Sequence, residues 1–218
     1  MVTADPPSRE EAAEFSYTGV ADATIELSRG EWEGDPWVEG GASRPTAGLA
    51  RDFRLTGDLD GDGAEESVFL LWTSSGGSGT FDYLAAMGRA EDGSALTLAT
   101  TALGDRVKVR SAEVTGRRVV LEVLQAGPED AACCPGQKMR RVFALEDGVM
   151  SEVSSEDHGR ISLDDLSGEW RLTHFGWNEE VPEGIDISLR GRAVNSYQVI
   201  PNRGRPAVSE PPVAGRCP

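Results

Sequence analysis

Short apolar runs separated by glycine and aspartate follow one another between residues 15 and 153. Residues 24–27 and 107–110 alternate between apolar and polar side chains, as half-buried strands do. Residues 67–72 (SVFLLW) form a nearly continuous apolar run, which favours a buried central strand. Asp147 and Gly148 separate two further runs and predict a hairpin turn. The spacing predicts an all-β domain over residues 15–153, mainly antiparallel, sandwich- or barrel-like, with little helix.

The pattern weakens on both sides of this domain. Residues 1–14 hold two prolines and five charged residues without apolar periodicity, which predicts a disordered arm. Residues 154–163 are polar and predict a linker. Residues 164–189 contain two more β-like runs and predict an incomplete second β module. Residues 190–218 are rich in arginine and proline and predict a disordered tail.

The formal net charge of the 218 residues is −16. Nucleic acid binding requires a concentrated basic patch, so this balance argues against a nucleic acid partner. The charge is uneven, because residues 190–218 hold five arginines and one acid (+4) while residues 1–189 carry −20. No apolar run is long enough to span a bilayer, and no apolar segment typical of a signal peptide follows Met1 in this sequence. With only two histidines, His-based catalytic triads and His-rich metal sites are disfavoured.

Alternate acidic residues between two apolar runs have the spacing of a calcium loop. Calcium prefers several oxygen ligands, and alternate side chains of a curled loop can reach one centre. Side-chain oxygens at loop positions 1, 3, 5 and 9 and a backbone carbonyl at position 7 predict the metal ligands Asp58, Asp60, Asp62, Glu66 and Ala64. Position 12, where an EF-hand has a bidentate glutamate, is Phe69, so the loop is not an EF-hand. A solvated acidic turn without a metal ion is the alternative.

Two of the three cysteines, Cys133 and Cys134, are adjacent, and the third is Cys217. Adjacent cysteines can close a strained, reducible disulfide ring, so a Cys133–Cys134 disulfide is one prediction. Two partly buried thiols, a redox switch and a soft-metal site are the alternatives. An odd count leaves at least one thiol outside any pairing within the chain.

Three groups of residues resemble known protein modules. The acidic loop resembles the D-x-D-x-D-G-x-x-[DE] calcium loop of FG-GAP-type and dockerin-type modules. The segments GDLDGDGAEESVFLLW, GGSGTFDYLA, LGDRVKV and GPEDAACCP resemble an envelope domain found upstream of META modules. Residues 166–173 (LSGEWRLT), Val181-Pro182 and residues 185–189 resemble the start of a META/HslJ-like domain. The G-C-N-x-Y motif that should follow is absent, so the META-like module is truncated.

The resemblance implies a mostly β protein of the bacterial cell envelope, periplasmic or extracellular, without catalytic residues. The expected function is that of a non-enzymatic binding or structural module, stabilised by Ca²⁺, with an envelope protein as its unidentified partner. A metal-dependent hydrolase that uses the acidic loop is one alternative. A protein-interaction module that uses Trp32 and Trp37 is another, because tryptophan is enriched at binding hot spots.

Overall fold

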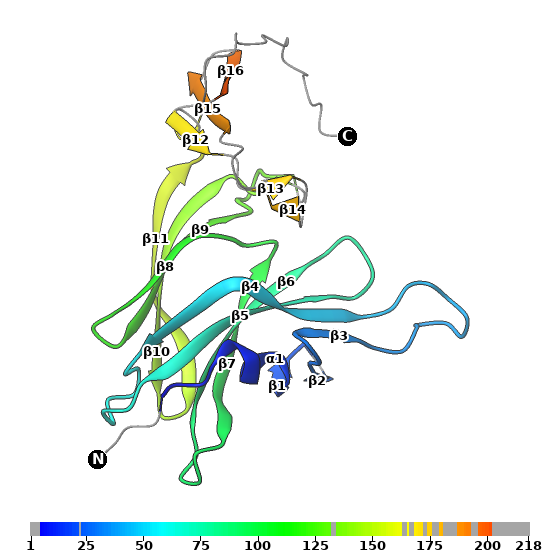
Figure 1. Ribbon diagram of the computed structural model, residues 1–218, viewed down its shortest axis with the longest axis vertical. Coiled ribbons are helices and arrows are strands. Elements are labelled where there is room, and N and C mark those ends of the chain that lie inside the picture. The colour runs from blue at the N-terminus through cyan, green and yellow to red at the C-terminus, as the bar shows by residue number, and fades with distance from the viewer. Residues whose placement is uncertain are drawn as a thin grey trace. The chain divides into compact units, whose positions relative to one another are not determined.

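The computed structural model describes residues 5–21, 23–131 and 134–162, and beyond them Asp165 and five short strands (Figure 1). The chain contains two compact units, Met1–Arg160 and Ile161–Pro218. The described strands are mainly antiparallel, and the described helical structure is little more than the short helix α1. The predicted all-β fold with little helix is therefore confirmed.

Three antiparallel sheets build the first unit (Figure 1). The five-stranded sheet has the order β3 (Glu31–Glu33), β4 (Thr46–Gly57), β5 (Glu66–Ser74), β6 (Phe81–Arg89) and β7 (Ala95–Asp105). The four-stranded sheet has the order β11 (Val149–Arg160), β10 (Gln137–Glu146), β9 (Arg118–Gln125) and β8 (Lys108–Thr115). The remaining sheet is the hairpin of β1 (Ser16–Val20) and β2 (Ala23–Glu26). Asp147 and Gly148 form the β10–β11 turn with positive φ angles of 51° and 74°, as the sequence predicts.

The central strands β5 and β6 are buried on both faces of the five-stranded sheet. Side chains on one face, including Val68 and Leu84, belong to a core shared with β9 and β10. Side chains on the other face, including Phe69 and Met87, belong to a second core shared with α1, β1 and β2. Because successive strand residues point to opposite faces, a strand between two cores is mainly apolar along its length. This requirement explains the continuous apolar run at residues 67–72.

The predicted disordered arm is wrong over residues 9–13, which form α1 (Arg9–Ala13). Ser8 caps the helix: its hydroxyl accepts from the backbone N–H of Glu11 (3.2 Å), and the Glu11 carboxylate accepts from the backbone N–H of Ser8 (2.8 Å). Ala12 and Ala13 are buried in the second core. A helix of five residues is too short to show apolar periodicity, so the capping pair was its only sequence signal.

The predicted linker is also wrong over residues 154–160, which continue β11. These residues pair with β10, from Ser154 opposite Val142 to Arg160 opposite Gln137. Their side chains are mostly exposed because β11 is the outer strand of its sheet. An edge strand with a polar exterior resembles a linker in sequence.

The second unit contains two small antiparallel sheets. One is the three-stranded sheet β12 (Gly168–Arg171), β15 (Ile187–Arg192) and β16 (Ser196–Pro201), and the other pairs β13 (His174–Phe175) with β14 (Glu179–Glu180). β15 and β16 extend strand structure to residue 201, into the region for which the sequence predicts the disordered tail. Residues 196–200 include tyrosine, valine and isoleucine, which favour strands, and they pair with β15. The rest of the predicted tail, residues 202–218, lies outside the described residues.

Candidate metal centre

The acidic loop joins β4 to β5 at one end of the five-stranded sheet. The last residue of β4, Gly57, pairs with the first residue of β5, Glu66. This pairing closes the loop at its base and brings Asp58, which follows Gly57, near the Glu66 side chain. The antiparallel register therefore gathers residues from the two ends of the loop.

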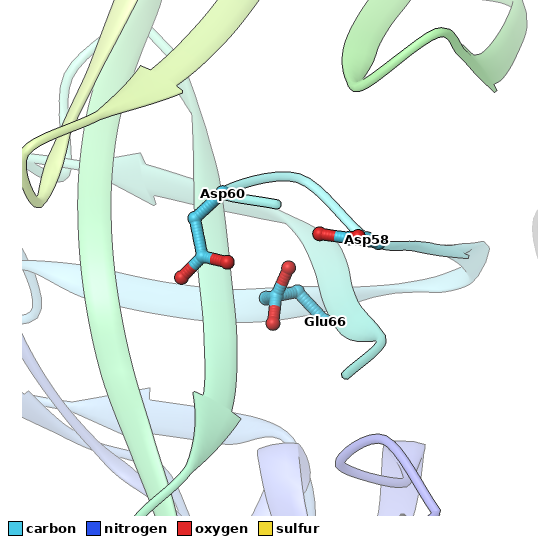
Figure 2. A group of neighbouring side chains, drawn as sticks. All are labelled: Asp58, Asp60 and Glu66. Atoms are coloured by element: carbon cyan, nitrogen blue, oxygen red, sulfur yellow. The ribbon is translucent and has the colours of Figure 1, made fainter. Parts of the chain in front are cut away.

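Three of the carboxylates converge on one point (Figure 2). One oxygen each from Asp58, Asp60 and Glu66 lies within 4.8 Å of the others. Two oxygens bound to the same calcium ion at about 2.4 Å can be at most about 4.8 Å apart. The spacing of the three side chains is thus compatible with a single cation between them.

Glu66 is the buried member of this acidic trio, with 3% of its surface exposed. Burial raises the pKa of its carboxyl, and the negative charges of Asp60, Asp62 and Asp58 raise the pKa further. The backbone N–H of Leu59 donates to Glu66 Oε2 at 2.7 Å, and this hydrogen bond lowers the pKa of the carboxyl. A cation at the trio would relieve both the burial penalty and the repulsion.

Backbone N–H groups of the loop hold the aspartates in place. The N–H of Gly61 donates to Asp58 Oδ1 (2.5 Å), and the N–H of Asp62 donates to Asp60 Oδ1 (3.0 Å). The third bond joins the N–H of Ala64 to Asp62 Oδ1 (2.7 Å). Gly61 and Gly63 have φ angles of +87° and +88°, a region that other residues rarely adopt. The loop curls because glycine stands at both of these positions.

Of the five predicted ligands, the structure brings together Asp58, Asp60 and Glu66. The carboxylate of Asp62 lies outside this trio and accepts from Ala64. Ala64 donates this hydrogen bond through its N–H group. Its predicted role as a ligand concerns the carbonyl and stays a prediction.

Arg117 is a neighbour of the loop that no sequence motif indicates. Arg117 lies in the β8–β9 turn, where its own φ angle is +65°. Its guanidinium donates to the backbone carbonyl of Asp60 and lies directly over Gly61. Because 57 residues separate Arg117 from Asp60, no local motif could have revealed this contact.

The other residues that the sequence singles out lie elsewhere. Trp37 is 63% exposed, and its indole N–H donates to the Ser75 carbonyl at 2.7 Å. Trp32 is half-buried against the second core and lines the same cleft as Trp37. Cys134 is exposed, whereas Cys133 lies outside the described residues, so the predicted disulfide stays a prediction.

Comparison with family models, curated proteins and solved structures returns no match to this chain. The META-like and FG-GAP-like resemblances therefore stay predictions from the residues that carry them. Within the described residues, no helix is long and apolar enough to cross a membrane.

Proposed function

We propose that the first unit is a calcium-stabilised, non-enzymatic structural or binding module of the bacterial cell envelope. The observation that supports the calcium site is the convergence of Asp58, Asp60 and the buried Glu66. The envelope location and the absence of catalysis are inferred from the resemblance of the sequence to envelope modules. An envelope protein is the partner that this resemblance favours.

The donor set favours calcium over other metals. All three groups are carboxylates, and hard cations prefer oxygen ligands. Calcium accepts irregular, flexible coordination, whereas magnesium requires near-octahedral geometry and keeps much of its water. We expect Asp62 to exchange its hydrogen bond with Ala64 for the ion, and the Ala64 carbonyl to turn inward with it. Those movements would complete the five-ligand set that the sequence predicts.

Thermal unfolding of the full chain in EDTA and in calcium tests the site. At a free calcium concentration one hundred times the Kd, binding to the folded state adds about 2.7 kcal/mol. For a chain of this size the expected rise in Tm is about 5–10 °C. An identical Tm in EDTA and in millimolar calcium would contradict the proposal. Turnover of ester or phosphate substrates in calcium would instead support the hydrolase alternative.

A Glu66→Gln variant gives the sharper test because its effect should change sign with calcium. In EDTA the neutral side chain removes repulsion from the trio, so the variant should be at least as stable as the parent chain. In calcium the variant should lack the rise in Tm and fall below the parent chain. Asp92→Asn is the control, since Asp92, like Asp60 and Asp62, accepts from a backbone N–H two residues on but lies in another turn. The control should keep the full response to calcium.

A further inference from the structure

The two large sheets of the first unit meet along β4 and β8, which contact each other (Figure 1). β3 pairs with only residues 46–48 of β4, so the rest of that edge lacks a pairing strand among the described residues. β8 is the outer strand of the four-stranded sheet. A cleft of about 690 Å³ opens between these two edges.

Both strands carry an irregularity at this cleft. In β4 the register moves from Leu49 opposite Leu71 to Arg54 opposite Phe69, so the intervening residues 50–53 are displaced from the pairing. In β8, Val109 pairs with Val123 of β9, and Ser111 pairs with the adjacent residue Glu122. Arg110 has no partner in this register and is therefore the extra residue of a bulge. Bulges redirect side chains and are frequent next to functional sites. Here they occur on two separate strands that line one cleft.

The cleft is lined by several cationic side chains together with apolar side chains. Its charged residues are Arg51, Arg54, Lys108 and Arg110 against Asp52 and Asp82, a local excess of positive charge in a chain of net charge −16. Its half-buried apolar residues are Phe53, Leu55, Leu70, Val109 and Ala112. The lining therefore has a net positive charge, although the protein as a whole is strongly acidic.

Of these four cationic side chains, Arg54 is the one that forms hydrogen bonds with other described residues. Arg54 donates to the carbonyls of Pro6 and Pro7 and so anchors the segment that precedes α1. The side chains of Arg51, Lys108 and Arg110 form no hydrogen bond or salt bridge with a described residue, and Lys108 acts on Asp82 through its charge alone. Their charges therefore remain available to an anion.

We propose that this β4–β8 cleft binds an alkyl carboxylate, with the carboxylate on Arg51, Lys108 and Arg110 and the alkyl chain on the apolar lining. The volume of the cleft is within the range of small-molecule sites, and guanidinium groups bind carboxylates through paired hydrogen bonds. Asp82 is 9% exposed in the wall of the cleft. Its negative charge opposes deeper entry of the ligand's carboxylate, so the head group stays with the cations at the rim.

Calorimetric titration of the full chain with dodecanoate, below its micelle concentration, tests the proposal. We expect saturable binding at one site, at least tenfold tighter than binding of acetate or of dodecyltrimethylammonium. Acetate has the head group alone, and the ammonium compound has the same alkyl chain with the opposite charge. Equal affinity for dodecyltrimethylammonium would show that charge plays no part, and equal affinity for acetate would show that the apolar lining plays none. Either result, or no binding of dodecanoate, overturns the proposal.

Variants locate the binding to the cleft. The double variant Arg51→Gln, Arg110→Gln should weaken dodecanoate binding at least tenfold while its Tm stays near that of the parent chain, because both side chains are exposed. The double variant Arg118→Gln, Arg140→Gln is the matched control, since it also removes two charges, both arginines pair with glutamates, and neither lines the cleft. Equal loss of affinity in both variants would mean that the overall charge, and not the cleft, controls binding. Titrations in EDTA keep this result independent of the calcium site.

Discussion

Asp82 is a buried acid whose ionisation opposes folding. It lies on β6, and its Oδ2 accepts from the backbone N–H of Val107 at 2.9 Å. Burial raises its pKa from 3.8 to about 6, although this hydrogen bond and the charge of Lys108 act in the opposite direction. Asparagine keeps an oxygen acceptor for Val107 and carries no charge. The Asp82→Asn variant therefore isolates the free energy of the buried charge.

The sign and size of the effect follow from the two pKa values. The folded state binds this proton more tightly than the unfolded state, so the contribution of Asp82 to stability is greatest below pH 3.8. That contribution is lost as the pH rises from 3.8 to about 6. Above this range the stability no longer changes with the ionisation of Asp82. A rise of this size corresponds to roughly 3 kcal/mol. Because asparagine accepts a weaker hydrogen bond than a carboxylate, we expect Asp82→Asn to stabilise the protein by about 2 kcal/mol at pH 7.5.

Urea denaturation at pH 7.5 and at pH 4 measures this difference. The advantage of Asp82→Asn should be near its maximum at pH 7.5 and much smaller at pH 4, where the parent residue is protonated in the folded state. Ser94 lowers the pKa of Asp92 through two hydrogen bonds, so the control Asp92→Asn should not stabilise the protein at either pH. An equal advantage of Asp82→Asn at both pH values, or destabilisation at pH 7.5, would refute the reasoning.

Two further variants test local features. Ser8→Ala removes the helix cap and should lower the free energy of unfolding by about 1 kcal/mol, measured by urea denaturation. Gly61→Ala and Gly63→Ala both place a side chain at positive φ, but only the first brings a Cβ against Arg117. Gly61→Ala should therefore destabilise the protein more than Gly63→Ala, and adding Arg117→Ala should remove the difference. A difference that persists without Arg117 would show that the contact is not its cause.

Much of the fold is visible in the sequence because its determinants are local. The apolar run at residues 67–72 predicts a central strand, and that strand lies between two cores. The Asp147-Gly148 turn predicts a hairpin that the structure contains. The helix at Arg9–Ala13 and the end of β11 were missed because a one-turn helix and a polar edge strand lack the apolar pattern on which such predictions depend.

The acidic trio and the β4–β8 cleft also differ in how far the local sequence reveals them. The acidic trio was predictable because Asp58, Asp60 and Glu66 lie within nine residues and strand pairing closes the loop between them. The β4–β8 cleft was not predictable because it depends on two register shifts. Register is set by pairing with other strands, so a sequence does not show that Arg51 and Arg110 line the same space.

Glu66 is the deepest carboxylate of the acidic loop and also the first residue of β5. Since β5 contributes to both cores, neither core can open while this strand keeps all of its neighbours. The first unit should consequently unfold as one cooperative body, and the amides of β5 should exchange with deuterium only on global unfolding. A ligand that holds Glu66 would then slow exchange in both cores at once, far from the loop itself.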